Sequence, residues 1–344
     1  QMCIRDRFGF ASYFLRPSIW HTGGFVNSSS RHQVNSKPAM HRLQGLLPAV
    51  HTPLLPDGSL HLERIEQICE FMVAQEVAGV FACGTTGEGS SLTIPERLQV
   101  AQRWTSVAPR HLKVIIHVGH TSLEDAKALA SGAQRSGAFA IAAMPPSFIK
   151  PRTIDDLVEF CAHVAAAAPM LPFYYYHIPS MTGVTFAMRD FLEVAADRIP
   201  TLAGIKFTHN DLADYGRAAD FEGGRYQVLY GLDEQLLSAL VLGCTAMIGG
   251  TYTFAATLYK KMIDAFRAGD LETARRQQSK SREMIAALIQ IGVLRGLKAS
   301  MRLIGVDCGP PRLPVTDLTA QESDFLRGKL EEAGVIADAA LLLR

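Results

Sequence analysis

The sequence predicts an α/β fold, a (β/α)8 TIM barrel with additional C-terminal helices. Eight short apolar segments alternate with stretches of helical periodicity between about residues 43 and 253, a pattern that indicates a parallel sheet. The segments are continuous apolar runs, as expected of strands that are covered on both faces. The pattern after residue 253 is mostly helical and is too long for the eighth barrel helix alone. A doubly wound open sheet is the alternative, but eight near-regular units favour a closed barrel.

The predicted elements follow one another in regular order. The strands are Gly45–Val50, Gly79–Cys83, Val114–Val118, Phe139–Ala143, Phe173–Tyr176, Leu202–Phe207, Val228–Tyr230 and Ala246–Ile248. The amphipathic stretches between them are Leu60–Gln75, Pro95–Ala108, Leu123–Gly137, Ile154–Ala168, Phe186–Ala196, Asp211–Asp220 and Asp233–Leu242. Pro95 suits the first turn of its helix, and Thr93 is placed to cap it.

The chain divides into three predicted parts. Residues 1–39 show no sustained period and carry five Arg or Lys residues but one acid, Asp6. An acid-poor start with Arg and Ser is typical of a mitochondrial transit peptide, but the first seven residues resemble translated adapter sequence. We favour an artefact or a disordered leader, with Met40 as a sensible start. Residues 40–253 form the predicted catalytic barrel, and residues 254–344 form a helical extension packed on its side.

The composition argues against several classes of protein. Of the 344 residues 48% are hydrophobic and 19% charged, and the net charge is +1. This balance is that of a globular protein with a sizeable core. No charge block indicates nucleic acid or an anionic membrane, and no apolar run approaches the roughly 18 residues of a membrane span. The six cysteines are scattered without a C-x-x-C pair, which predicts reduced thiols in the cytoplasm rather than disulfides or a zinc site.

The strand Leu202–Phe207 carries a lysine near its end. Strict alternation puts Leu202, Gly204 and Lys206 on one face of the strand, where Gly204 leaves room for a substrate. Since Ile205 and Phe207 flank Lys206, we expect the amine to be poorly solvated, and burial lowers a lysine pKa. A neutral amine can attack a ketone and form a Schiff base. Taken alone, the segment also fits a lysine that extends into solvent.

The other strand ends are candidates because barrel enzymes place their sites there. The second strand is followed by Gly84–Gly89, in which backbone N–H groups and the hydroxyls of Thr85 and Thr86 can hold a small anion. A carboxylate fits better than a polyphosphate because no lysine follows the loop. The alternative is a glycine turn with capping threonines.

Polar residues also end the fifth and sixth strands. Tyr176 ends the fifth, shares a face with Tyr174, and could move protons near a Schiff-base lysine. Aromatic core packing explains at least one of these tyrosines. Thr208 follows the sixth strand beyond Lys206.

The seventh and eighth strands end in acids and glycines. Asp233 and Glu234 could bind polyol hydroxyls, or they could simply provide favourable charge at a helix N-terminus. Gly249 and Gly250 permit close approach of a ligand.

Two histidines end the third strand, His117 and His120. A metal-dependent aldolase needs a third ligand, so two histidines are weak evidence for a metal. We interpret them as structural residues.

These motifs occur together in the order of a known family. Gly84–Glu88, Tyr174–Pro179 with Thr182 and Gly183, Gly204–Lys206, and Gly231–Glu234 resemble the dihydrodipicolinate synthase/N-acetylneuraminate lyase superfamily of class I aldolases. The resemblance is closer to its animal-type lyases, through Phe173–Pro179, Asp233–Leu240 and Gly309–Pro314. It extends from about Leu43 to Pro314 and leaves out the leader.

The resemblance implies a cofactor-free and metal-free enzyme that cleaves N-acetylneuraminate reversibly to N-acetylmannosamine and pyruvate. Lys206 would form a Schiff base with the C2 ketone of the open-chain sugar, and Tyr176 would take the proton of the C4 hydroxyl. The residues implied to bind substrate are Thr85 and Thr86 for the pyruvyl carboxylate, and Thr208, Gly231, Asp233, Glu234, Gly249 and Gly250 for the rest of the molecule. The family also implies a homotetramer; its partners would be small molecules, with no nucleic acid and no membrane.

Two positions depart from the family pattern. Bacterial lyases carry a serine where Gly250 stands, so one polyol contact is missing here. Met144–Phe148 contains no tyrosine, whereas dihydrodipicolinate synthases use one there in a proton relay. This disfavours the synthase activity and leaves the relay unassigned.

Two other functions remain open. One is a lyase for another 2-oxo acid, such as 4-hydroxy-2-oxoglutarate, although Asp233 and Glu234 would repel its second carboxylate. The other is a non-catalytic barrel that only binds pyruvate or sialic acid, which the presence of both Lys206 and Tyr176 argues against.

Overall fold

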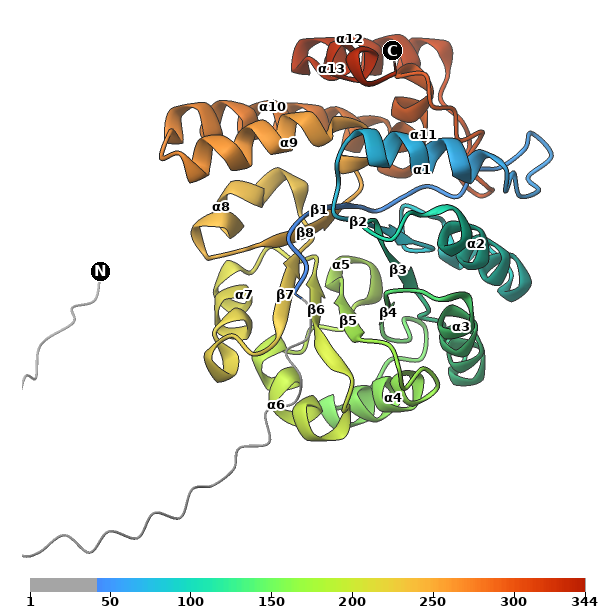
Figure 1. Cartoon of the computed structure of the whole chain (residues 1–344), viewed down its shortest axis with the longest axis vertical. Coiled ribbons are helices and arrows are strands. Elements are labelled where there is room, and N and C mark those ends of the chain that lie inside the picture. The colour runs from blue at the N-terminus through green and yellow to red at the C-terminus, as the bar shows by residue number, and fades with distance from the viewer. Residues whose placement is uncertain (1–41, 344) are drawn as a thin grey trace, which may run out of the picture. The chain divides into compact units, whose positions relative to one another are not determined.

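The computed structural model of the protein describes residues 42–343, and these form an eight-stranded barrel wrapped in helices (Figure 1). The predicted leader lies outside the described residues. The strands are β1 Gly45–Pro48, β2 Gly79–Ala82, β3 Lys113–His117, β4 Ala140–Ala143, β5 Phe173–His177, β6 Leu202–Phe207, β7 Gln227–Tyr230 and β8 Ala246–Gly249. Each predicted strand agrees with an observed one to within two residues at either end.

The sheet closes on itself. Neighbouring strands pair in parallel in chain order from β2 to β8, and β8 pairs with β1. Between β1 and β2, the Val50 N–H donates to Phe81 O (3.1 Å) and the Ala78 N–H donates to Leu46 O (2.9 Å). The predicted closed barrel is confirmed, and the open sheet is excluded.

Helices follow the strands on the outside of the barrel. They are α1 Arg64–Ala74, α2 Ile94–Val107, α3 Leu123–Ser136, α4 Ile154–Ala166, α6 Met188–Arg198, α7 Leu212–Ala219, α8 Leu236–Val241 and α9 Tyr252–Arg267. As predicted, Thr93 caps α2 and Pro95 lies in its first turn. A short helix that the sequence did not predict, α5 Pro179–Thr182, follows β5. The seventh predicted helix begins as a 3-10 turn, Asp233–Gln235, before α8.

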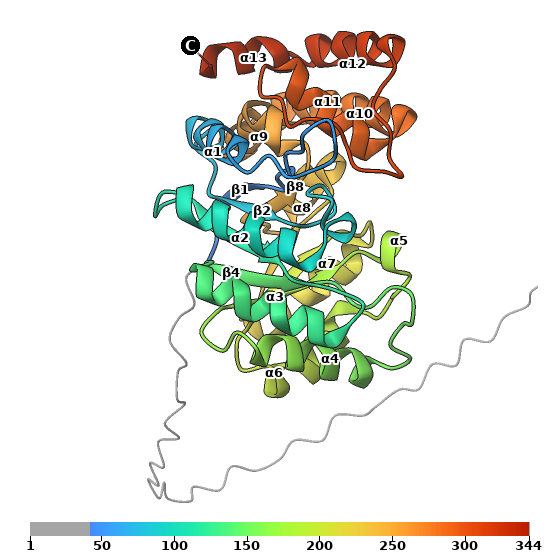
Figure 2. The same cartoon turned by 90° about the vertical axis from the view of Figure 1, so that its right-hand side faces the viewer.

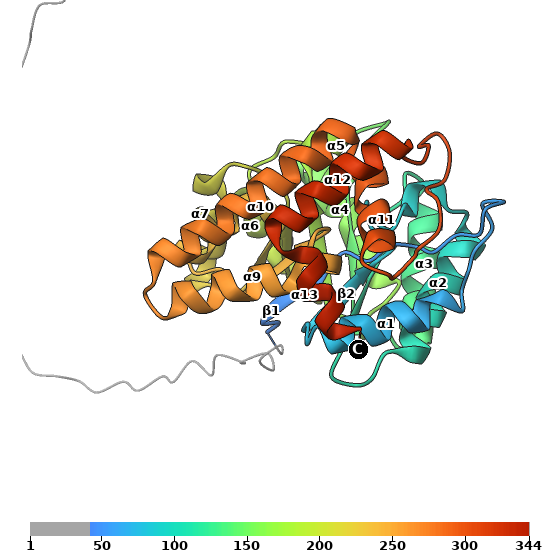
Figure 3. The same cartoon turned by 90° about the horizontal axis from the view of Figure 1, so that it is seen from above.

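Four more helices make up the C-terminal extension: α10 Leu271–Ile291, α11 Val293–Leu303, α12 Ala320–Ala333 and α13 Val335–Leu342. Figures 1 and 2 show α12 and α13 at the top of the view with α10 and α11 below them near α9, and Figure 3 shows α12 running along α10. α10 packs against α9, and α12 packs against both α10 and α11. The proposed boundary at residue 253 falls at the start of α9.

Within the described residues, no helix is by itself both long and apolar enough to cross a bilayer, and only α10 and α11 taken together, with a bend of 116° between them, pass that test.

The cysteines of the described region are buried and free: Cys69, Cys83, Cys161, Cys244 and Cys308. Burial raises the pKa of the Cys69 and Cys83 thiols to about 11. These thiols are therefore protonated at neutral pH. Their assignment to a reducing compartment stays a prediction.

The predicted alternation along β6 is wrong at its start. Leu202 packs in the core between strands and helices, together with Ile205, whereas Ala203 belongs to the cluster inside the barrel. The cause is a register shift against β5, in which Phe173 pairs with Leu202 but Tyr174 pairs with Gly204. The shift exchanges the faces of the first two residues of β6.

The structure gives a different reason for glycine at position 204 than space for a substrate. A Cβ at this position would lie 1.8 Å from Gln227 O and 2.9 Å from Gln227 N on β7. Glycine is therefore required by the close approach of the β7 backbone, and the structure gives no evidence that it makes room for a substrate.

Replacing Gly204 tests this packing. We expect Gly204→Ala to lower the free energy of unfolding by about 1–3 kcal/mol or more, because the added methyl group meets backbone that cannot move aside easily. Gly216→Ala in α7 is the matched control, since a Cβ there meets nothing within 4 Å. The control should gain about 0.5–1 kcal/mol from higher helix propensity. Equal urea midpoints for both variants would contradict this explanation.

Candidate active site

The side chain of Lys206 is buried between two aromatic rings. It is 4% exposed, and its Nζ lies 3.9 Å from the ring centroid of Phe81 on β2 and 3.9 Å from that of Tyr176 on β5. The two rings pack edge to face, with their centroids 5.7 Å apart. The predicted burial is confirmed, and a lysine that extends into solvent is excluded. The neighbours differ from those predicted, because Phe207 packs in the outer core against Tyr215.

This environment changes the ionisation of the amine. Burial lowers the pKa of Lys206 to about 7, while the negative charge of Asp233 acts in the opposite direction. The shift from 10.5 corresponds to roughly 5 kcal/mol against the charged form. Cation–π attraction favours the charged form by about 0.5–2 kcal/mol per ring, so desolvation dominates. A neutral, nucleophilic amine is therefore available near pH 7.

Tyr176 lies opposite Lys206 in the register of β5 and β6. Its hydroxyl is 3.3 Å from Thr85 Oγ1 in the loop after β2. Burial raises the pKa of Tyr176, and the nearby hydroxyls of Thr85 and Thr208 lower it by less. The phenol is therefore protonated at neutral pH and lies beside both the amine and the loop.

The loop Gly84–Gly89 is held in a compact turn. The Glu88 N–H donates to Thr85 O (3.0 Å), and the Thr52 hydroxyl donates to Gly87 O (2.6 Å). Thr85 is exposed and faces Tyr176, while Thr86 is buried. The turn places the Thr85 hydroxyl beside that of Tyr176, whose ring covers the buried amine.

Asp233 is a buried acid that follows β7. Its Oδ2 accepts a hydrogen bond from the Thr251 N–H (2.9 Å) and another from the Thr251 hydroxyl. Burial raises its pKa to about 6, and the hydrogen bonds from Thr251 oppose that rise. Its backbone oxygen accepts from Gln278 Nε2 (3.1 Å) and Ser281 Oγ (3.2 Å) on α10. Asp233 and Glu234 both lie in the first turn of the 3-10 helix Asp233–Gln235, as the helix-charge interpretation also expects. Glu234 is half-buried in the same turn.

The predicted glycines leave room for other site residues. A Cβ at Gly231 would lie 2.1 Å from Thr208 Oγ1, and one at Gly249 would lie 1.8 Å from Asp233 Oδ1. A Cβ at Gly250 would lie 2.9 Å from Leu297 Cδ1 and 3.1 Å from Thr86 Oγ1. The structure therefore brings the predicted residues of β2, β5, β6, β7 and β8 to one end of the barrel.

His117, the last residue of β3, and His120, which follows the strand, have different hydrogen-bond partners. His117 Nδ1 lies 3.1 Å from Cys83 O, and its ring packs edge-on against Tyr176 at 5.8 Å. Burial lowers the pKa of His117 well below 6.5, so the ring is neutral. His120 Nδ1 instead accepts from the Ser122 N–H (3.0 Å). Within residues 42–343, no three His, Cys, Asp or Glu side chains are grouped so as to hold a metal ion.

Several residues of the site were not predicted from the sequence. They are Phe81, which covers the amine, and Thr251, Gln278, Ser281 and Leu297, which lie against Asp233 or Gly250. Phe81 had a weak signal, since it lies in the strand that leads to the Gly84–Gly89 loop. Thr251 directly follows Gly249 and Gly250 at the end of the eighth strand, although nothing local indicated its contact with Asp233. Gln278, Ser281 and Leu297 had no signal, because their contacts are distant in sequence.

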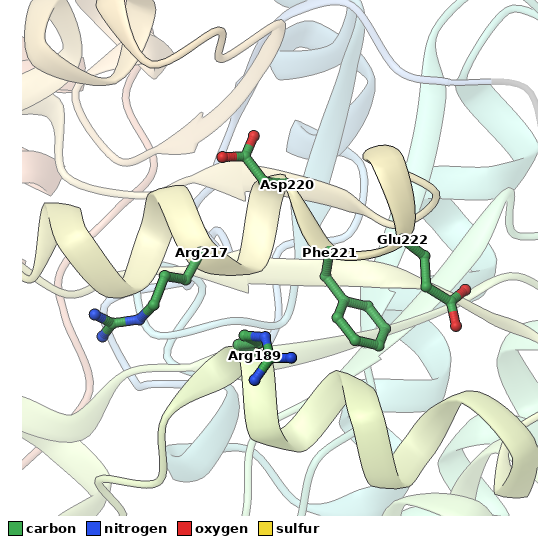
Figure 4. Close-up of a pocket in the computed structure, with 5 residues that line it drawn as sticks. All are labelled: Arg189, Arg217, Asp220, Phe221 and Glu222. Carbon is green, nitrogen blue, oxygen red and sulfur yellow. The ribbon is translucent and has the colours of Figure 1, made fainter. Parts of the chain in front are cut away.

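A surface pocket lies away from these residues, at α6, α7 and the turn after α7 (Figure 4). Arg189, Arg217, Asp220, Phe221 and Glu222 line it. None of the predicted site residues takes part in this pocket.

Comparison with known proteins agrees with this arrangement. The model of the dihydrodipicolinate synthetase family matches residues 42–333. The chain belongs to this family. Among characterised members, the N-acetylneuraminate lyase of Sus scrofa is 40% identical over 301 residues, which cover 86% of this chain and 94% of that protein.

Solved members of the family share the fold. The N-acetylneuraminate lyase of Aliivibrio salmonicida aligns with a TM-score of 0.84 and 37% identity, over 86% of this chain and 98% of that one. That of Proteus mirabilis aligns with a TM-score of 0.83 and 37% identity, over 85% and 99%.

The pKa of Lys206 predicts the pH dependence of imine formation. Only the neutral amine attacks a ketone, so the rate of pyruvate trapping with cyanoborohydride should rise with pH and reach half its maximum near pH 7. Intact-mass spectrometry at a series of pH values measures the rate. A midpoint near 10.5, the value of an ordinary lysine, would contradict the effect of burial.

Proposed function

We propose that this protein is a class I aldolase that cleaves N-acetylneuraminate reversibly to N-acetylmannosamine and pyruvate. The observation that carries the proposal is the buried Lys206 amine beside the Tyr176 hydroxyl, at the end of a barrel strand. Family membership and relatives about 40% identical that are N-acetylneuraminate lyases support the choice of substrate.

The chemistry follows from the positions of the two residues. The neutral amine of Lys206 adds to the C2 ketone of the open-chain sugar and gives a carbinolamine. Uptake of a proton from solvent and loss of water then give an iminium ion. The electron pair of the C3–C4 bond then moves to the iminium nitrogen and leaves an enamine, while the C4 hydroxyl becomes the aldehyde of N-acetylmannosamine. Protonation of the enamine at C3 and hydrolysis of the imine release pyruvate and restore Lys206.

Tyr176 would accept the proton of the C4 hydroxyl. Because its phenol is protonated at neutral pH, it must pass its own proton on as it accepts the new one. The Thr85 hydroxyl at 3.3 Å, and the substrate carboxylate that we place beside Thr85 and Thr86, offer a path for that proton.

The far side of the site would bind the polyol chain. Asp233 and Glu234 are acids at the end of β7, and Thr208 lies beside Gly231 at the ends of β6 and β7. Carboxylates accept hydrogen bonds from hydroxyls and repel a second substrate carboxylate. We therefore expect 4-hydroxy-2-oxoglutarate to be a poorer substrate than N-acetylneuraminate.

Three further statements about the protein remain proposals. The barrel would comprise residues 40–253 and the extension residues 254–344. The enzyme would work in the cytoplasm, and it would assemble as a homotetramer, as the family resemblance implies. Sedimentation velocity of the purified protein tests the assembly.

A direct assay tests the activity. Incubation with N-acetylneuraminate should release pyruvate, measured by reduction with lactate dehydrogenase, and Lys206→Met should release none. With 4-hydroxy-2-oxoglutarate we expect catalytic efficiency at least tenfold lower. Faster release from this second substrate would overturn the choice of substrate, and no release from either would overturn the enzymatic proposal.

Asp233→Asn separates sugar binding from imine formation. Loss of one charge-assisted hydrogen bond to the polyol costs about 1.5–3 kcal/mol, so kcat/KM for N-acetylneuraminate should fall by roughly one to two decades. Pyruvate trapping should survive, with its pH midpoint lowered, because the anion that raises the Lys206 pKa is gone. Unchanged cleavage in a less stable variant would show that Asp233 is only structural.

A further inference from the structure

The C-terminal extension reaches the site through a buried ion pair. Lys298 on α11 and Glu88 in the loop after β2 have side chains that are 0% and 1% exposed, and Nζ lies 2.7 Å from Oε1. The Lys298 ammonium also donates to Pro310 O (2.7 Å). Neither residue has a role in the chemistry proposed above, although Glu88 lies in the motif that carries Thr85 and Thr86.

Glu88 is the anion that compensates Lys298. The other titratable groups that influence Lys298 are Cys308, a neutral thiol whose pKa burial raises to about 12, and the cation Arg312. His51, close enough for the Lys298 charge to lower its pKa, is neutral because burial lowers that pKa to about 3. A buried charge without its partner is strongly unfavourable, so Glu88 and Lys298 hold each other in place.

The backbone of Glu88 indicates that the contact constrains the loop. Its φ is +54°, in the left-handed region that residues other than glycine rarely adopt. Such a conformation persists only where surrounding contacts enforce it. Here the carboxylate is held from two directions, because Oε2 accepts from the Arg312 N–H (2.7 Å) while Oε1 faces Lys298.

Arg312 extends this hold to the neighbouring helix. It lies in the Gly309–Pro314 segment, and its guanidinium donates to both carboxylate oxygens of Glu96, at 2.9 and 2.8 Å. Glu96 is the capping-box residue of α2. The extension therefore holds the loop from its Glu88 end and from the helix that follows it.

The constrained end of the loop is next to the residues that we expect to hold the substrate. The Glu88 N–H donates to Thr85 O (3.0 Å). Leu297, adjacent to Lys298 in α11, lies with Thr86 Oγ1 against Gly250. A change at the ion pair would therefore move both threonines relative to Lys206.

We propose that Glu88 and Lys298 are positioning residues that fix Thr85 and Thr86 for the carboxylate of the bound 2-oxo acid. The C-terminal extension is thereby a part of the active site rather than a separate stabilising layer. This inference rests on the proposed function only for the identity of that carboxylate.

The test compares two ketones that differ in the carboxylate. Pyruvate has one, and hydroxyacetone does not, so only pyruvate should depend on the threonines. In Lys298→Met, the pyruvate concentration for half-maximal cyanoborohydride trapping should rise at least tenfold. The value for hydroxyacetone and the maximal labelling of Lys206 should stay within twofold of wild type. A general distortion of the barrel would instead change both ketones alike, and that result would overturn the proposal.

A double variant keeps the proposal testable if Lys298→Met fails to fold. Glu88→Gln with Lys298→Met removes both charges, leaves no isolated buried ion, and keeps an acceptor for the Arg312 N–H. We expect it to fold and to show the same selective loss for pyruvate, because the specific attachment of the loop is gone. Wild-type affinity for pyruvate in the double variant would overturn the proposal. Lys298→Arg should recover at least part of the pyruvate affinity.

Arg302→Met is the matched control on the same helix. Arg302 pairs with Asp307 and Asp317 at the exposed face of α11, away from Glu88. Its trapping constants should equal those of wild type for both ketones, and a selective pyruvate defect there would overturn the assignment to Lys298. If the wild-type protein trapped neither ketone, the Schiff-base function itself would fail, which is a different outcome from trapping that the variants leave unchanged.

Discussion

Desolvation of the Lys206 amine is the interaction on which the active site depends. Phe81 and Tyr176 come from β2 and β5, and both rings reach Nζ only because the strands close into a barrel. They replace water that would otherwise stabilise the ammonium, while the Asp233 carboxylate partly restores that stabilisation. Because the pKa of Lys206 is near 7, neutral amine is available at neutral pH to attack a ketone.

The rest of the site depends on helices beyond the barrel. Asp233 is held by Thr251, whose hydroxyl lies 2.6 Å from that of Tyr259, which in turn lies 2.9 Å from Ser281 Oγ on α10. Lys298 of α11 contacts Glu88 in the loop that carries the two threonines. The extension thus contacts both the sugar side and the carboxylate side of the proposed site.

Much of the fold was predictable because it rests on local pattern. Eight apolar runs, their helical connections and the Thr93 cap are properties of neighbouring residues, and the structure has them where the sequence places them. The faces of Leu202 and Ala203 were wrong because a register shift against β5 is set by a strand nearly thirty residues earlier. The contact of Phe81 with Lys206 and the pairing of Glu88 with Lys298 join residues more than a hundred positions apart, and beyond the weak signal of Phe81 no local pattern marks them.

The most direct test locates the covalent adduct. Protein reduced with borohydride in the presence of pyruvate at pH 7 is digested, and tandem mass spectrometry assigns the modified residue. We predict a single modification on Lys206, and no modification of Lys206→Met under the same conditions. Among residues 42–343 the other buried lysine is Lys298, and its charge is compensated by Glu88. An adduct on another lysine, or labelling that persists in Lys206→Met, would contradict it.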